Sequence, residues 1–471
     1  MQDLSIDKNA RACIIEADVY IKRFLLLMKK LSLVSLAWPI FIETALFMLL
    51  GFVDVFVLSR YDDLAASSVN AANQAVSITT VVFTVISTAS AVMISQYLGA
   101  KKREAASRVA ALSIVAHLIF GIVISFLFVF FSREILSFIG AEDKVLDFSS
   151  QYLSIVGGFI FMQAILSSVS VIIRNHGMTK VSMFVTVGMN VFNTVLDVIL
   201  VKGYLGFPQM GVKGVAIATT LSRVLGVAVL LAVLFTKVEK PSVFRLLLPF
   251  PKEDVRNVAR IGVPSAMETF LYNISQVIIT SIVFNCLTDT ELVTKTYVQN
   301  ITMIFYIFAV SIGQASQILT GHLVGAGKFD EAKRKILTSY GAALGITLLV
   351  CLAGVLFRHQ LVDVFTDDKA VIALGANILI INVMLEMGRT TNLVIIASLR
   401  GAGDVFYPTL CAIFSMILIS TLGSYFFAVV LDMGIYGLWI ANAADECVRG
   451  VLMLLRLKSG KWKEKALDRR N

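Results

Sequence analysis

The sequence predicts an all-α integral membrane protein with twelve transmembrane helices in two six-helix lobes, related by a pseudo-two-fold axis along the membrane normal. Three observations predict it. Of the 471 residues, 57% are hydrophobic and 15% are charged, and the mean hydropathy is +0.83, far outside the range of soluble domains. Apolar segments long enough to cross a bilayer recur along the chain. The second half of the chain also repeats residues of the first half.

Residues 1–30 mix acidic and basic side chains and contain no apolar run followed by a small-residue cleavage site. We therefore expect an uncleaved cytoplasmic lead-in. Twelve apolar spans follow, six of them in a first lobe (31–236) and six in a second lobe (261–455). The expected spans are 31–58, 68–97, 109–132, 148–173, 181–201, 211–236, 261–285, 297–321, 336–357, 370–398, 405–430 and 435–455.

Residues 237–260 are expected to link the lobes on the cytoplasmic side, because they combine three prolines with six basic residues. Residues 456–471 form a basic tail. With both termini placed in the cytoplasm, the inner loops and tails hold 30 of the Lys and Arg residues and the outer loops hold 8. The positive-inside rule therefore predicts a multi-pass protein of the cell (inner) membrane with both termini cytoplasmic. The net charge of +9 reflects this orientation rather than a nucleic-acid surface.

The repeat has an offset of 223 to 226 residues. Gly99 recurs as Gly325, and Arg174 recurs as Arg400, both at an offset of 226. The segment Pro39-x-x-x-Glu43-Thr44 recurs as Pro264-x-x-x-Glu268-Thr269 at an offset of 225, and residues 211–218 recur at an offset of 223. With six spans in each repeat, both lobes enter the membrane in the same orientation and face each other across a cleft.

The strongest candidate site is in the fifth span. Asn190, Asn193 and Asp197 lie at i, i+3 and i+7, so they share one face of a helix. A carboxylate inside a span indicates function by default, although local pairing near the headgroups is the alternative. Asp54 in the first span lies at a similar depth, as do Asn70, Asn73, Gln74 and Thr219. Such groups could exchange a proton or ligate Na⁺. The positions in the second lobe that match the acids are not acidic, so we expect the ion site on one side only.

Three further carboxylates are candidate countercharges for a cationic substrate. Glu386 lies three residues before Arg389 in the tenth span, where an ion pair is the favoured interpretation. Glu43 and Glu268 lie one turn after a proline in each repeat, where they line the cleft mouth or support a kink. Arg174 and Arg400 are expected to be architectural residues of glycine-containing loops. Few arginines are therefore expected in the cleft.

Other classes of chemistry are not indicated. The five cysteines have no CxxC or zinc spacing, and no Ser/His/Asp set or Walker loop is present. We expect no enzyme activity, no cofactor apart from the coupling ion, and no nucleic-acid partner. The expected partners are a small organic substrate and membrane lipids, and the protein is expected to function as a monomer.

Several motifs together resemble those of the multidrug and toxic compound extrusion (MATE) family of secondary transporters, over nearly the whole chain. The segments that carry the resemblance are Phe52-Val53-Asp54, 95–100 (SQYLGA), 321–326 (GHLVGA), Asn193-x-x-Leu196-Asp197, 211–219 and 399–404 (LRGAGD).

The resemblance implies a twelve-helix, two-lobe antiporter that exports organic, often cationic compounds in exchange for H⁺ or Na⁺. It also implies an ion site in the first lobe made by Asp54, Asp197 and Asn193. Members with a second-lobe cation site carry a Glu where this chain has Tyr272, which favours coupling in the first lobe. Two alternatives remain: a lipid-linked oligosaccharide flippase, and a polytopic membrane enzyme that acts on lipids.

Overall fold

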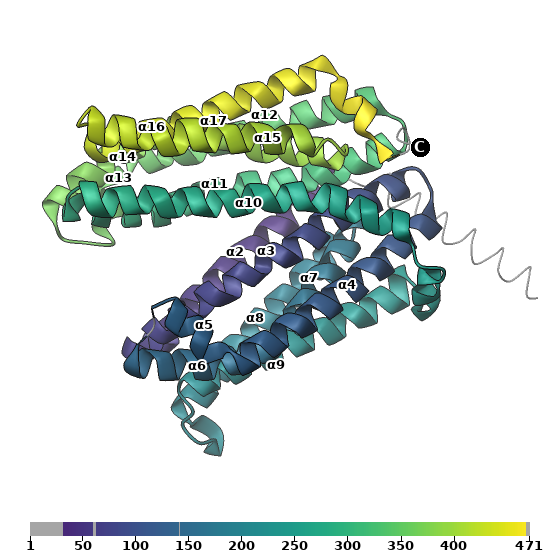
Figure 1. Ribbon diagram of the computed structural model, residues 1–471, viewed down its shortest axis with the longest axis horizontal. Coiled ribbons are helices and arrows are strands. Elements are labelled where there is room, and N and C mark those ends of the chain that lie inside the picture. Colours follow the sequence, from purple (N-terminus) through teal and green to yellow (C-terminus); the bar gives the residue numbers. More distant parts are fainter. Residues whose placement is uncertain (1–31, 60–62, 141, 468–471) are drawn as a thin grey trace, which may run out of the picture.

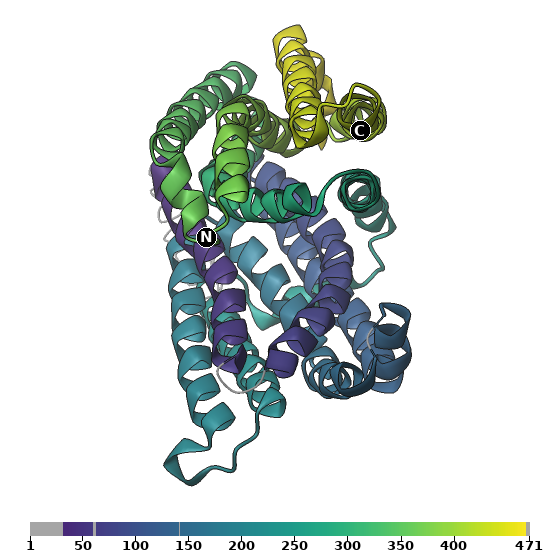
Figure 2. The ribbon, with the colours of Figure 1, turned by 90° about the vertical axis from the view of Figure 1, so that its left-hand side faces the viewer.

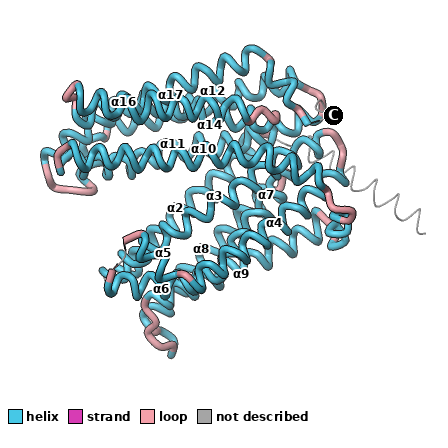
Figure 3. Tube along the Cα trace, viewed as in Figure 1, coloured by secondary structure: helices cyan, strands magenta, loops and turns pink. Residues whose placement is uncertain are grey.

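The computed structural model of the protein describes residues 32–59, 63–140 and 142–467. The predicted lead-in, residues 1–30, and the last residues of the tail lie outside this description. So do the side chains of residues 50–57, which include Asp54, although the backbone of this segment is helical. Figure 3 shows that the described chain consists of helices joined by short loops.

The first group of helices lies together in the lower half of Figure 1. Its members are α2 (Leu33–Ser59), α3 (Asp63–Gly99), α4 (Arg103–Phe130), α5 (Ser132–Phe138), α6 (Asp143–Gly158), α7 (Ile160–Asn175), α8 (Thr179–Lys202) and α9 (Val212–Val233). A π-helical turn, η2 (Leu234–Val238), extends α9, and a 3₁₀ segment, η3 (Pro241–Leu247), leads out of the group.

The second group lies together in the upper half of Figure 1. Its members are α10 (Lys252–Cys286), α11 (Asp289–Gly325), α12 (Phe329–Leu356), α13 (Arg358–Asp363), α14 (Lys369–Gly401), α15 (Phe406–Ser415), α16 (Leu422–Tyr425) and α17 (Gly434–Ser459). The π-helical turn η4 (Met416–Thr421) joins α15 to α16, and a second one, η5 (Phe426–Val430), extends α16. A 3₁₀ segment, η6 (Lys461–Lys465), follows α17.

Each predicted span corresponds to a helix or a bent pair of helices. Among the described residues, nine helices are long and apolar enough to cross a bilayer, and α6 and α7 form a tenth span bent by 47°. The helices α2 and α17 complete two sets of six. The helix α17 is less apolar because it carries Asp445, Glu446 and Arg449 within its length.

Several helices begin earlier than predicted, and α10 and α11 differ most from their predicted starts. The helix α10 starts at Lys252 rather than near residue 261, since Glu253 and Asp254 suit its first turn and Asp254 pairs with Arg108 of α4 at 2.5 Å. The helix α11 starts at Asp289, where Thr288 and Glu291 form a capping box. Lys295, expected in an outer loop, is therefore a buried residue of α11.

The two groups of helices meet at one end and diverge toward the other (Figures 1 and 2). We call the end where they meet, which carries Gly99 of α3 and Gly325 of α11, the closed end. A Cβ atom on Gly99 would lie 2.1 Å from the His322 carbonyl oxygen, and one on Gly325 would lie 1.9 Å from the Gln96 carbonyl oxygen. Only glycine allows the backbones of α3 and α11 to approach this closely. The repeated glycines therefore set the contact between the lobes.

Hydrogen bonds at the closed end follow the same repeat. The Gln96 side chain donates to the carbonyl oxygen of Gly401 at 2.8 Å, and His322 Nε2 lies 2.8 Å from the carbonyl oxygen of Asn175. Gln96 and Asn175 lie 226 residues before His322 and Gly401, so the two bonds are pseudo-symmetric copies. They run in opposite directions across the contact between the lobes at the closed end, which we call the seam.

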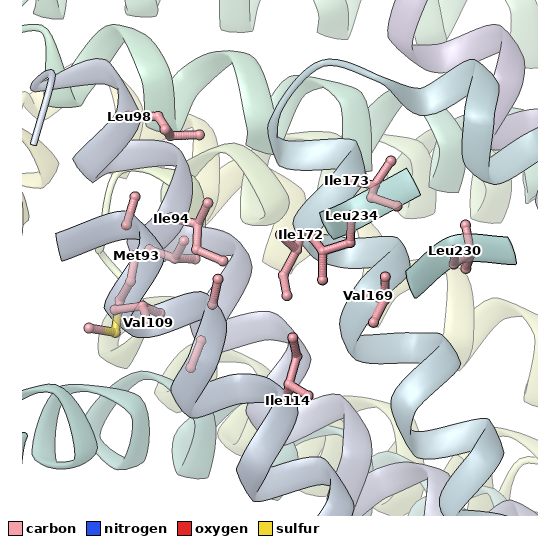
Figure 4. Close-up of a cluster of buried hydrophobic side chains, with 14 of the residues drawn as sticks. Met93, Ile94, Leu98, Val109, Ile114, Val169, Ile172, Ile173, Leu230 and Leu234 are labelled. Carbon is pink, nitrogen blue, oxygen red and sulfur yellow. The ribbon is translucent and has the colours of Figure 1, made fainter. Parts of the chain in front are cut away.

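Apolar packing seals the closed end around these bonds. Figure 4 shows Met93, Ile94, Leu98, Ile172 and Leu234 among the side chains of one buried cluster. The same cluster includes Ile261, Val405 and Leu467 from the second half of the chain. The Leu467 N–H also donates to Gln96 Oε1 at 3.0 Å, so the end of the described tail crosses to the first lobe.

Replacing Gly325 with Val is expected to lower the free energy of unfolding by about 1–3 kcal/mol, because the new side chain overlaps the α3 backbone. Thermal unfolding of the purified protein in detergent measures this. Gly341→Ala in α12 is the matched control, since a Cβ there meets nothing within 4 Å. Equal melting temperatures for Gly325→Val and the wild type would contradict the assigned contact.

Candidate functional site

A cavity of about 1000 Å³ lies between the two lobes. Its walls come from α2, α3 and α7 on one side and from α10, α11, α14, η4 and α17 on the other. Aromatic and sulfur-containing side chains form apolar parts of the wall: Phe47, Tyr272, Met303, Tyr306 and Met416. The charged residues on the wall are Glu43, Arg174, Glu268, Arg389, Arg400, Glu446 and Arg449. The volume is in the range of small-molecule sites.

Two of the wall acids form pairs that follow the internal repeat. Glu268 of α10 accepts from Arg400 of α14 at 2.5 Å. In the first lobe, Glu43 of α2 lies 3.8 Å from Arg174 of α7, and Arg174 also donates to Gln314 of α11 at 3.2 Å. The arginines were expected to be architectural loop residues. This expectation is wrong, because α7 and α14 continue through Asn175 and Gly401 and place both arginines on the cavity wall.

A second charge cluster lies in the second lobe, between α14 and α17. Arg389 donates to Glu386 at 2.6 Å and lies 3.7 Å from Glu446. Arg449 contacts Asp445 at 2.8 Å and Glu446 at 3.0 Å. The predicted Glu386–Arg389 ion pair is thus present, and Glu386 is fully buried.

The expectation of an ion site in the first lobe only stays a prediction. The second lobe holds a different feature, in which five ionisable side chains meet. Lys295 adds a sixth buried charge nearby, where its ammonium donates to Thr280 at 3.0 Å. The signal for this cluster is present in the sequence, because Asp445, Glu446 and Arg449 interrupt an apolar span. The number of residues between Glu386 and these three side chains gives no indication that α14 and α17 pack against each other.

The predicted polar face of the fifth span is present on α8 and is longer than expected. Its buried residues are Thr179, Ser182, Thr186, Asn190, Asn193 and Asp197, at spacings of three or four residues. Asp197 is completely buried. With the Asn193 amide oriented to satisfy both of its ends, its nitrogen donates to Asp197 Oδ2 at 3.1 Å and its oxygen accepts from the Thr219 N–H at 3.2 Å. Asn193, Asp197 and Thr219 are therefore brought together as predicted.

Polar side chains on α8 also hold α2. The Thr179 hydroxyl donates to the Ser35 carbonyl oxygen at 3.2 Å, which is the oxygen that Pro39 leaves without its helical partner. Ser182 donates to Glu43 at 3.0 Å, and Asn190 donates to the Leu46 carbonyl oxygen at 3.1 Å. Three hydrogen bonds, spaced along the helix axis, thus connect α8, which carries Asp197, to α2 of the cavity wall.

Other predicted site residues lie elsewhere. Asn70 and Gln74 are exposed on α3 and Asn73 is half-buried, so they are not part of the buried site around Asp197. Asp197, Asn193 and Asn190 do not line the cavity. The side chain of Asp54 lies outside the described residues. The hydrogen bonds between α8 and α2 connect the helix of Asp197 to a helix of the cavity wall.

A site for a coupling Na⁺ would draw on oxygen ligands in the first lobe. Asp197 and Asn193 supply a carboxylate and an amide oxygen of the kind that hard cations bind. No group of three or more His, Cys, Asp or Glu side chains among the described residues is arranged to hold a metal ion. Asp197 and Asn193 could therefore serve a proton site, with the carboxylate as the group that is protonated, or a Na⁺ site.

Two lobes in contact at one end, with a charged cavity between them, are typical of membrane transporters. Comparison with protein families gives the particular family. The MatE family model matches residues 39–199 and 264–426, one segment in each half of the chain. The chain belongs to the MATE family of transporters and is therefore a multi-pass membrane transporter rather than an enzyme.

Curated relatives match over nearly the full length. The chain is 36% identical over 439 residues to "Uncharacterized transporter YisQ" of Bacillus subtilis, covering 93% of this chain and 96% of that protein. It is 27% identical over 436 residues to "Probable multidrug resistance protein NorM" of Thermotoga maritima, covering 93% and 94%.

Solved structures share the fold. A crystal structure of "MATE in the bent conformation" superposes with a TM-score of 0.83 at 20% identity, covering 91% of this chain and 94% of that chain. A structure described as the outward-facing conformation of a multidrug resistance MATE family transporter of the MOP superfamily gives 0.81 at 21% identity, covering 91% and 96%.

Replacing Arg449 with Met is expected to lower the free energy of unfolding by about 3–5 kcal/mol, because it leaves Asp445 and Glu446 buried with one fewer counterion. Chemical denaturation in detergent measures the change. The matched control is Arg133→Met, which removes an exposed pair with Asp147 and should cost less than about 1 kcal/mol. Equal losses in the two variants would contradict a structural role for the cluster.

Proposed function

We propose that the protein is a secondary antiporter that exports amphipathic organic compounds in exchange for H⁺ or Na⁺. The observation that carries this proposal is the cavity of about 1000 Å³ between lobes that are in contact at one end only. Closing the divergent end and separating the lobes at the closed end would expose the same cavity to the opposite side of the membrane.

The orientation follows from charge. The closed end carries η2, η3 and the basic tail after α17, and these segments are rich in Lys and Arg. By the positive-inside rule the closed end faces the cytoplasm, both termini are cytoplasmic, and the cavity of this conformation opens outward. Function as a monomer in the cell membrane is part of the proposal.

The coupling ion is proposed to act at Asp197 and Asn193, together with Asp54. Protonation or Na⁺ binding at Asp197 would change its interaction with the Asn193 amide. Since α8 is bonded to α2 through Thr179, Ser182 and Asn190, a shift of α8 would move the cavity wall at Glu43 and Phe47. This is an indirect coupling, in which the ion and the cargo bias one conformational equilibrium.

A flippase for lipid-linked oligosaccharides has to bind a pyrophosphate, so the small number of cleft arginines expected from the sequence would disfavour it. That argument does not apply, because four arginines line the cavity. Membership of the MATE family and two sets of six spans favour the antiporter. Family membership also disfavours the polytopic lipid enzyme.

The test is dye efflux by the protein reconstituted in liposomes under an imposed pH or Na⁺ gradient. One of the two gradients is expected to drive efflux, and Asp197→Asn should reduce the driven rate by at least about tenfold, since an amide cannot exchange a proton or balance a cation. Asp54→Asn is expected to behave alike.

The control is Asp147→Asn, an exposed carboxylate on α6 away from both the cavity and α8. It should leave the driven rate unchanged. Full gradient-driven efflux in both Asp54→Asn and Asp197→Asn would refute the assignment of the coupling site. Absence of gradient-driven efflux for the wild type would refute antiport itself.

A further inference from the structure

The carboxylates on the cavity wall are not available to a cationic cargo. Four arginines and three glutamates line the cavity. Glu43 lies 3.8 Å from Arg174, Glu268 accepts from Arg400 at 2.5 Å, and Glu446 lies 3.0 Å from Arg449 and 3.7 Å from Arg389. An organic cation would have to displace a guanidinium group to reach Glu268 or Glu446, and this exchange of one cation for another gains little. Glu43 Oε2 accepts no hydrogen bond, but the atom is buried beside Arg174.

In most of these pairs the arginine side chain is more exposed than its carboxylate partner. The Arg174 side chain is 18% exposed and its Glu43 partner 6%, whereas Arg400 is 20% exposed and Glu268 15%. Arg389 is 21% exposed, while Glu386 behind it is 0% exposed and Glu446 is 10% exposed. The exception is Arg449, which is as buried as its partners. The surface offered to a cargo is therefore richer in guanidinium than in carboxylate.

The guanidinium groups also retain hydrogen-bonding capacity. Each has five N–H donors in a planar fork that suits carboxylate and phosphoryl oxygens. Arg400 donates to Glu268 through Nη2, and its Nε is buried without a hydrogen-bond partner. Arg174 and Arg400 are also adjacent to Asn175 and Gly401, whose carbonyl oxygens accept the bonds that cross the seam between the lobes. A group bound to either arginine would thus lie next to the contacts that must break for the closed end to open.

From this arrangement we infer that the exported compound carries an acidic group, a carboxylate or a phosphoryl group, which binds at Arg174 and Arg400 while its apolar body packs against Tyr272, Met303 and Tyr306. The inference rests on the proposed function, because it assigns the substrate class of the same cavity. It differs from the cationic substrate that the sequence motifs imply.

The experiment measures equilibrium binding of two matched dyes to the full-length protein in nanodiscs, rhodamine B with its free carboxylate and the ethyl ester of the same dye. The free acid is expected to bind at least about tenfold more tightly than the ester, and Arg400→Gln should reduce its affinity by about tenfold, the effect of losing one charge-assisted hydrogen bond. Arg133→Gln, on an exposed pair outside the cavity, is the control with unchanged affinity.

Two further variants separate recognition by the arginine from simple charge balance. Arg400→Lys should keep part of the affinity for the free acid. The neutral double variant Glu268→Gln/Arg400→Gln should remain weak for the acid. Restored binding in that double variant would overturn the inference, because Arg400 would then serve only to neutralise Glu268.

Other outcomes are equally decisive. Tighter binding of the ester, or no binding of either dye up to the solubility limit, would overturn the inference. Displacement of the free acid when phosphatidylglycerol replaces part of a neutral lipid would also overturn it, and would assign the arginines to a lipid headgroup. Because binding is measured without a gradient, dye binding without gradient-driven efflux would refute antiport and leave the assigned acidic substrate class intact.

Discussion

The close contact between α3 and α11 at the closed end is the constraint on which the architecture depends. Its centre is two glycines of the repeat, Gly99 and Gly325, each packed against the backbone of the other helix. Around them, Gln96 and His322 each reach the last residue of a helix in the opposite lobe, Gly401 of α14 and Asn175 of α7. The internal repeat supplies both copies of this contact, so one short sequence motif specifies both sides of it. The orientation of the lobes, and hence the cavity between them, follows from this contact.

The repeat is symmetric at the seam and asymmetric where chemistry is expected. Both lobes keep a Glu–Arg pair, Glu43 with Arg174 and Glu268 with Arg400. Away from the seam they differ: the first lobe has a stripe of hydroxyl and amide groups that ends at Asp197, and the second has a cluster of paired charges between α14 and α17. Arg174 and Arg400 of the retained pairs lie next to Asn175 and Gly401 at the closed end. The divergent interiors suit the proposed division between an ion site in one lobe and a polar cavity wall in the other.

Hydropathy and the repeat were sufficient to predict the helices and their grouping, because each span is specified by its own residues and each repeat by a fixed offset. The shared face of Asn190, Asn193 and Asp197 was predictable for the same reason, since helical periodicity is local. Pairings between helices were not predictable. Arg174 and Arg400 lie at helix ends, and the exact bounds of those helices decide whether the side chains lie in a loop or on the cavity wall. The contact between Arg389 and Glu446 depends on how α14 packs against α17.

The end of the described tail breaks the symmetry of the seam. Gln96 accepts from the Leu467 N–H and simultaneously donates to Gly401, whereas His322, its counterpart in the second repeat, has no such strand of chain across it among the described residues. Separation of the lobes at the closed end would break the Leu467 hydrogen bond together with the two copied bonds. Opening at that end would therefore release the segment that follows η6 from the first lobe.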